Sequence, residues 1–445
     1  MRKNKWVLAS MVLAAGLALV GCGESTGSKE KTTAAAGEGS DKNISCTLTL
    51  ATWDVTAART FDELDLEGRF QELYPNVEID IEEFSAEPEY FNSMKIRSSA
   101  SELPDLMFHK SDSMYQYEEY LTDLTDTEAN KNNQIAAEYM VNGRVLGVPD
   151  RKTNDYVFYW VDMFEEAGVE VPDTWGEFVE VSEKLQAYFG AKDPDYSAIS
   201  MGAKESWTTY PFMEYGPAAE SGNGYYWDSM TEEDKPFAEG TAIHTVYGKV
   251  YDLFGKGVFG KDPLGITSDQ SKELFAKRKG TMTLSSPMFL SDYKADGYDP
   301  SGIETFYLPF RDDDSSEFNL VTQGDCFLSV TEHSENPEVA KAFLEFYFSE
   351  AWYPDYINHI SSDSTMMPFH KELDEVLMTA PELQPDVVYV TYGAGKSDFI
   401  NMVSETKFDC KELGAEMLTE GFDFNRRMEE LNQSWTDARK KLNLQ

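Results

Sequence analysis

Apolar stretches of strand length alternate with segments of helical periodicity from about residue 44 onward. Residues 44–53, 77–84 and 103–108 are rich in β-branched and aromatic side chains and predict strands. Residues 60–74 and 90–101 lie between them and predict helices. This order of elements is typical of a parallel sheet covered by helices on both faces, so we expect an α/β lobe.

A second lobe is predicted to begin after Pro149. That proline and the polar residues that follow it exclude a helix and favour an extended crossover. Residues 156–161 then predict a buried strand, and a new helix starts at Trp175 with Asp173 or Thr174 as its N-cap. Because the chain leaves one sheet, crosses over and starts another, we expect two lobes joined by a hinge.

Two further crossings are expected between the lobes. Residues 321–324 are predicted to return the chain to the first lobe, and residues 365–369 to send it back. A hinge of several strands bends through small dihedral changes in each of them. The predicted boundaries are 44–149 with 323–366 for the N-terminal lobe, and 150–322 with 367–445 for the C-terminal lobe.

The start of the chain predicts export and lipid attachment. Three basic residues within the first five precede an apolar run at 6–20, which is too short for a comfortable membrane span, so residues 1–21 predict a cleaved signal peptide. Residues 19–22 resemble the bacterial lipobox, in which Cys22 becomes the first mature residue and carries two acyl chains. An ordinary secretory peptide with a chance cysteine is the alternative. Residues 22–43 have no large apolar side chain and predict a flexible tether.

The composition of the chain limits the classes of molecule that it can bind. The chain has 38 basic and 80 acidic residues, a formal net charge of −42, which excludes nucleic acid and leaves the lipid anchor as the only membrane contact. Acidity mildly favours a neutral or cationic ligand. Cys46, Cys326 and Cys410 have no metal-like spacing, so free thiols are expected, with a Cys46–Cys326 disulfide as the alternative. We predict no metal and no cofactor.

Residues 146–178, LGVPDRKTNDYVFYWVDMFEEAGVEVPDTWGEF, carry a family resemblance. The stretch resembles the family 1 extracellular solute-binding proteins of ATP-driven importers, whose pattern runs G-x-P, a spacer, Tyr-Asn, Phe-x-x-x-Gly and Pro-x-Thr-Trp-x-Glu-Phe. Here Tyr159-Trp160 replaces Tyr-Asn. The resemblance implies a two-lobed periplasmic-binding-protein-like (type II) fold, each lobe a mostly parallel sheet flanked by helices. It also implies a monomer that binds a carbohydrate, most simply an oligosaccharide, and passes it to the permease of an ABC importer.

A sugar site requires aromatic rings for the C–H faces of the sugar and carboxylates, amides or Arg for its hydroxyls. Ligands of open α/β sheets bind at the carboxyl ends of strands. The resemblance to maltose-binding relatives makes Glu205 and Trp207 the best candidate pair for contacting a sugar. The full set of expected ligand-binding residues is Trp53, Asp54, His109, Asp112, Arg151, Glu205, Trp207, Tyr225, Tyr226, Met288, Phe289 and Asp325.

Several of these residues have a structural alternative. Trp53 fits the core of a lobe, Asp54 fits a helix N-cap, and Arg151 fits a hinge salt bridge. His109 stands where relatives have a Trp and is expected as a polar contact at the rim. Met288 likewise replaces an aromatic residue, which leaves Phe289 as a substitute.

The sequence leaves other functions open. A polyamine, a glycerophosphodiester or a peptide would also suit the family. A surface glycan hydrolase would need two carboxylates across a cleft, for which Glu205 and Asp112 are the one pair we can propose. The G-x-S-x-G at residues 23–27 lies in the predicted tether without a strand before it, so it is no nucleophile elbow. We therefore predict binding without catalysis.

Overall fold

A computed structural model describes residues 42–111, 113–362, 364–366, 375–393 and 396–444. The predicted signal peptide, Cys22 and Asp112 lie outside the described residues, as does most of the tether. Across the described ranges, no helix has both the length and the apolar character needed to cross a bilayer.

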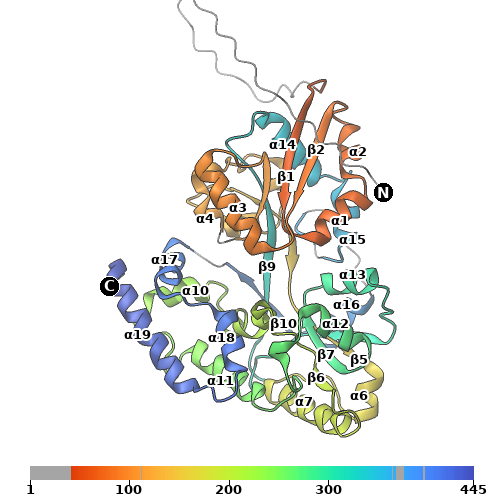
Figure 1. Cartoon of the computed structure of the whole chain (residues 1–445), viewed down its shortest axis with the longest axis vertical. Helices are drawn as coiled ribbons and strands as arrows, with labels where there is room; N and C mark the ends of the chain where they lie inside the picture. The colour runs from red at the N-terminus through yellow and green to blue at the C-terminus, as the bar shows by residue number, and fades with distance from the viewer. Residues whose placement is uncertain (1–41, 112, 363, 367–374, 394–395, 445) are drawn as a thin grey trace, which may run out of the picture. The chain divides into compact units, whose positions relative to one another are not determined.

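A six-stranded sheet runs through the first lobe and continues along β9 and β10 into the second (Figure 1). Its strand order is β10-β9-β3-β1-β2, and β4 pairs with β9 off this path. β1 is parallel to β2 and β3, whereas β9 is antiparallel to β3 and β4 and parallel to β10. The strands are β1 (Cys46–Thr52), β2 (Val77–Glu83), β3 (Leu106–His109), β4 (Val148–Thr153), β9 (Phe318–Val330) and β10 (Val387–Tyr392).

Helices of the first lobe cover this sheet with apolar faces. Val339, Phe343 and Phe346 recur at helical spacing in α14 and are buried. The predicted single helix at 60–74 is wrong: Asp65 adopts a left-handed φ of 56° and caps a second helix through the Gly68 N–H. The helices are α1 (Val55–Glu63), α2 (Leu66–Gln71), α3 (Glu87–Ala100), α4 (Ser113–Gln116), α5 (Glu128–Lys131), α14 (Pro337–Tyr347) and α15 (Tyr353–His359).

The second lobe has a four-stranded sheet in the order β6-β7-β5-β8. β6 is parallel to β7, but β5, which arrives from the hinge, runs antiparallel to both of its neighbours. The two-lobed α/β fold is thus confirmed, and the expectation of a mostly parallel sheet is wrong for this lobe. The strands are β5 (Tyr156–Trp160), β6 (Ser197–Ile199), β7 (Gly280–Ser285) and β8 (Ile303–Phe306).

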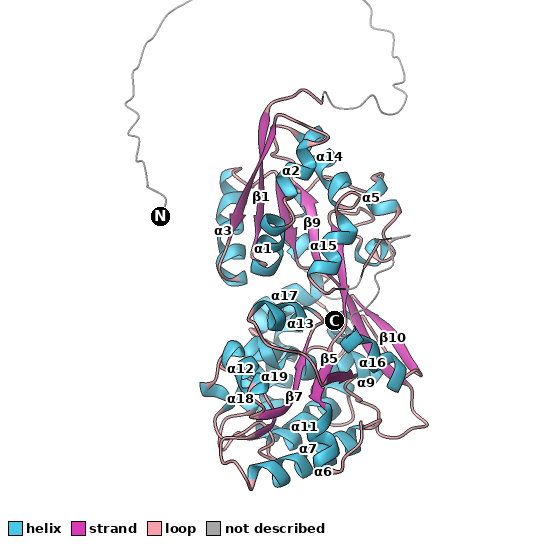
Figure 2. Cartoon of the chain, turned by 90° about the vertical axis from the view of Figure 1, so that its right-hand side faces the viewer, coloured by secondary structure: helices cyan, strands magenta, loops and turns pink. Residues whose placement is uncertain are grey.

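Helices make up most of the second lobe (Figure 2). Gly168, with a φ of 64°, ends the first of them, and Thr174, one of the two predicted N-caps, caps the next within a complete capping box. The helices are α6 (Val161–Ala167), α7 (Trp175–Gly190), α8 (Tyr210–Met213), α9 (Gly216–Ser221), α10 (Tyr226–Ser229), α11 (Ala242–Phe254), α12 (Ser268–Ala276), α13 (Met288–Ala295), α16 (Glu375–Leu383), α17 (Ser397–Thr406), α18 (Cys410–Met417) and α19 (Phe424–Leu442).

The buried apolar side chains form two separate cores. β9 contributes to both: Phe318 and Leu320 belong to one core, and Phe327 and Leu328 belong to the other. Along the crossover from β4 to β5, the residues between the two cores are polar and nevertheless buried. The lobes are therefore joined by strands whose middle sections are held by polar contacts.

A substitution of Phe61 tests how tightly the first core is packed. Its ring is 1% exposed and lies 5.7–6.4 Å, centroid to centroid, from four other aromatic rings. We expect Phe61→Ala to lower the free energy of unfolding by about 3–5 kcal/mol, because it leaves a cavity among rigid rings. Urea denaturation measures the change. Ile96→Ala, at a side chain that is 71% exposed, should change stability by less than about 0.5 kcal/mol.

Candidate functional site

A cleft between the lobes consists of two adjoining hollows, of about 650 and 630 Å³. Trp207, Tyr210, Ser286 and Met288 line both hollows, so these four residues form the junction. The first hollow is also lined by the first-lobe residues Glu87, Lys110 and Gln116 and by the second-lobe residues Glu214, Tyr392, Phe399 and Lys411. Hydroxyl and acidic side chains dominate the second hollow, among them Ser85, Ser200, Glu205, Thr208, Thr267, Ser268 and Asp292.

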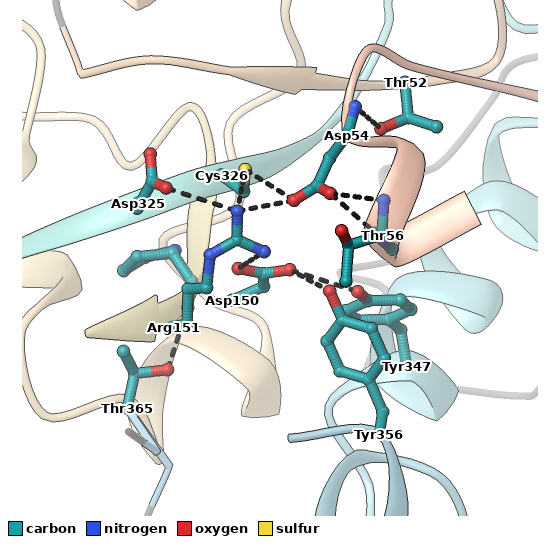
Figure 3. A network of polar contacts seen from close by, with 12 residues as sticks. Thr52, Asp54, Thr56, Asp150, Arg151, Asp325, Cys326, Tyr347, Tyr356 and Thr365 are labelled. Carbon is teal, nitrogen blue, oxygen red and sulfur yellow. Dashed lines mark hydrogen bonds and ion pairs between the residues drawn. The ribbon is translucent and has the colours of Figure 1, made fainter. Parts of the chain in front are cut away.

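Arg151, on β4, lies at the floor of the first hollow within a network of carboxylates (Figure 3). Its side chain is only 4% exposed, and Nη2 lies 2.6 Å from Asp54 Oδ2 and 3.2 Å from Asp325 Oδ2. Nη2 also lies 2.9 Å from the sulfur of Cys326, which has a φ of 51°. Burying a guanidinium costs free energy unless anions compensate its charge, and these carboxylates do so.

Asp325 receives a second cation. Lys110 Nζ donates to Asp325 Oδ1 at 2.7 Å. Burial alone would raise the pKa of Asp325, but Lys110 and Arg151 together hold that pKa well below its ordinary value. Asp325 is therefore a fixed anion at the cleft floor, and it positions the ammonium of Lys110 beside the hollow.

Asp150 is the third carboxylate around Arg151, 3.8 Å from Nη1, and it is fully buried. Its Oδ2 accepts hydrogen bonds from the hydroxyls of Tyr347 (3.2 Å) and Tyr356 (2.8 Å) (Figure 3). Burial raises the pKa of Asp150 to about 7, although Arg151 lowers it in part. This carboxyl attaches the crossover strand to the helices of the first lobe.

The second lobe supplies the aromatic wall. Trp207 is 49% exposed and stacks on Tyr210 at 6.4 Å between ring centroids. The Tyr210 hydroxyl donates to Asp155 Oδ1 at 2.6 Å, which fixes the Tyr210 ring against the hinge. Glu205 lines the second hollow and accepts a hydrogen bond from the Ser268 N–H at the start of α12 (2.8 Å). An exposed indole beside oriented hydroxyls and carboxylates can bind a polyhydroxylated ring.

The structure brings together six of the predicted site residues. Arg151, Trp207, Met288 and Asp325 line the first hollow, and Glu205, Trp207, Met288 and Phe289 line the second. Phe289 is mostly committed to the core, where its ring lies 4.7 Å from that of Phe158.

Five of the predicted residues line neither hollow. Trp53 is 9% exposed and packs between Tyr90 and Phe91 at 4.8 and 5.1 Å. Asp54 caps α1 and pairs with Arg151 instead of facing the cleft.

The other three have partners outside the hollows. His109 is fully buried, Nδ1 lies 3.0 Å from Ser113 Oγ, and burial lowers the pKa of His109 to about 3. Tyr226 is buried, and its hydroxyl oxygen accepts from the Ile243 N–H. Tyr225 donates to Glu138 at 3.0 Å.

Sequence reasoning missed Lys110, Tyr210, Glu214 and Lys411. Lys411 Nζ lies 3.3 Å from Glu214 Oε2, and this carboxylate raises the pKa of Lys411. Lys110 directly follows the third strand, a position that the strand-end rule indicates. Nothing in the sequence brings Lys411, on α18, to the cleft.

The remaining candidate groups are the cysteines and the possible metal ligands. Cys46, Cys326 and Cys410 are free thiols, so the alternative disulfide is not formed. Among the residues with described positions, no group of three or more His, Cys, Asp or Glu side chains is arranged to hold a metal ion.

Comparisons with known proteins place this cleft in context. The profile of the family described as "Bacterial extracellular solute-binding protein" matches residues 52–354. A multiple sugar-binding protein from Streptococcus mutans serotype c is 24% identical over 218 residues, 48% of this chain. The chain spans about half the length of this curated relative, 50%.

Solved structures resemble the whole fold. The solute-binding protein RafE in complex with raffinose superposes with a TM-score of 0.72 at 18% identity, over 89% of this chain and all of RafE (100%). BlMnBP1 of an ABC transporter from Bifidobacterium animalis subsp. lactis, in complex with mannobiose, has a TM-score of 0.73 at 17% identity, over 90% of this chain and 96% of that one. At these identities the likeness shows the fold.

Asp155 gives the hinge a testable pH dependence. Burial raises the pKa of Asp155 to about 7, and the hydrogen bond from Tyr210 offsets this only in part. Because the folded state holds the proton more tightly than the unfolded chain, the contribution of Asp155 to stability is full below about pH 4 and is lost as pH rises through about 7. In Asp155→Asn this loss disappears.

We therefore expect the stability of Asp155→Asn relative to wild type to rise from pH 5 to pH 8, by at most about 1.4 kcal/mol per pH unit. Urea denaturation at both pH values measures it. Asp398→Asn, at an exposed aspartate, should follow the wild type. Parallel pH profiles for wild type and Asp155→Asn would contradict the prediction.

Proposed function

Because this chain belongs to the family of bacterial extracellular solute-binding proteins, we propose that it captures an oligosaccharide between its two lobes and delivers it to an ABC importer. The observation that carries the proposal is the cleft itself, in which two hollows meet at the exposed ring of Trp207. A single sugar ring would fill only part of the two joined hollows. Relatives in complex with raffinose and mannobiose support the ligand class.

Recognition follows from the side chains of the cleft. The apolar face of a sugar ring would stack on Trp207, while hydroxyls at its edge would bind Glu205 and the serine and threonine side chains of the second hollow. Closure of the lobes would bury the sugar and present a paired surface to the permease. The protein would bind and release its ligand without breaking bonds.

A polycation fits the first hollow less well than a neutral sugar does. Lys110, Arg151 and Lys411 all line the first hollow and would repel a polyamine. Their carboxylate partners Asp325 and Glu214 are already ion-paired. A neutral ligand leaves these pairs intact.

Binding is tested by calorimetry with raffinose, stachyose, mannobiose and spermidine. We expect heat from at least one oligosaccharide and none from spermidine. Heat from spermidine alone would refute the carbohydrate assignment.

Trp207 should dominate the affinity for any sugar that binds. We expect Trp207→Ala to weaken binding about tenfold or more, because it removes the exposed ring at the junction of the hollows. Tyr188→Ala, on α7 and 38% exposed, is the matched control and should bind like the wild type. Equal affinities for the two variants would show that Trp207 does not contact the sugar.

The lipid anchor is also part of the proposal: Cys22 would hold the mature protein on the outer face of the membrane. We expect Cys22→Ala to move the protein from the membrane fraction to the soluble extracellular fraction. Cys410→Ala, which removes a different thiol, should leave it in the membrane fraction. Retention of Cys22→Ala in the membrane fraction would contradict lipidation at this residue.

A further inference from the structure

Helix α13 of the second lobe contacts the first lobe directly. Asp292 Oδ1 accepts a hydrogen bond from Thr56 Oγ1 at 3.0 Å and pairs with Arg59 Nη2 at 3.2 Å. Thr56 and Arg59 both lie on α1. One residue earlier, Ser291 Oγ donates to the carbonyl of His359, at the end of α15, at 3.1 Å. α13 therefore faces two elements of the first lobe (Figures 1 and 2).

Both sides of this contact are rigidly held. On α13, the neighbouring Phe289, Leu290 and Tyr293 are buried in the core of the second lobe. On the other side, Asp54 caps α1 through the N–H groups of Thr56 and Ala57, and the same carboxylate is held by Arg151. A contact between two fixed helices resists movement of one lobe against the other.

The contact also lies at the edge of the candidate cleft. Asp292 lines the second hollow together with Val55, at the start of α1. Opening the lobes at this edge would separate Asp292 from Thr56 and Arg59. The bonds made by Asp292 thus favour the lobe arrangement of this structure.

We propose that Asp292 is a positioning residue that stabilises this arrangement of the lobes through Thr56 and Arg59, and so raises the affinity for ligand. The effect on affinity rests on the proposed function. The apparent affinity of a protein that alternates between two states scales with the population of the competent state. The side chains of Arg59 and Asp292 are 39% and 36% exposed, so the change in population is modest, roughly two- to fivefold.

The chain offers a matched control four residues along. Asp296 follows α13 and pairs with Lys272 at 2.6 Å within the second lobe. Asp296→Asn removes the same charge as Asp292→Asn and also disturbs Lys272, but it leaves the contact between the lobes intact.

Small-angle X-ray scattering of the full chain without ligand tests the proposal. We expect Asp292→Asn and Arg59→Gln to increase the radius of gyration, the double variant to add nothing further, and Asp296→Asn to match the wild type. Raising the salt concentration should expand the wild type but have less effect on Asp292→Asn, because salt screens partly exposed ion pairs. Identical scattering from Asp292→Asn and Asp296→Asn would overturn the proposal.

A second measurement uses stachyose as the probe. Asp292→Asn should bind it roughly two- to fivefold more weakly than Asp296→Asn does. If neither the wild type nor any variant binds a sugar, the proposed function is wrong. The scattering experiment would still test whether Asp292 stabilises the arrangement of the lobes. If the scattering differs as expected but the affinities are equal, the lobe contact does not set affinity and that part of the proposal is wrong.

Discussion

The structure depends on a buried positive charge at the point where the chain crosses between its lobes. Arg151 is almost fully enclosed, and the carboxylates around it come from the end of the first strand, from the crossover and from β9. Removing one partner of a buried ion pair typically costs about 3–5 kcal/mol, because the remaining charge stays desolvated. Arg151 therefore holds three distant segments together. These segments form the floor of the cleft and the N-terminus of α1.

This arrangement separates rigid parts from the part that can bend. Each lobe has its own core of interlocking rings, such as the cluster around Phe61. Between the cores, Asp150, Thr153 and Asp155 are buried but belong to neither apolar cluster. Polar contacts on strands can tolerate small dihedral changes that a packed core cannot, so bending is confined to the crossings.

Local patterns predicted local structure well. The strand at β5 and the N-cap at Thr174 each follow from a few adjacent residues. The break at Asp65 was missed because a single left-handed residue divides a continuous helical pattern. β10 was missed although its residues, VVYVTY, are all β-branched or aromatic and so carry a local strand signal.

The candidate site was harder to predict than the fold. Ligand-binding residues were expected at strand ends, but a strand's side chains alternate between its faces, so His109 points into the core while the next residue, Lys110, lines the hollow. Asp54 was placed at the right edge of the sheet, yet its partner Arg151 is distant in sequence and no local pattern links the two. Trp207, which lines both hollows, was singled out through the family resemblance.

The contrast between Trp207 and the other indoles has a practical consequence. Of the tryptophans that the structure describes, Trp207 is 49% exposed, whereas none of the others exceeds 9%. A change in the hydration of that one ring alters its fluorescence against a nearly constant background from the rest. The chain thus carries its own optical reporter at the centre of the cleft, and events there can be followed in solution without attaching a dye.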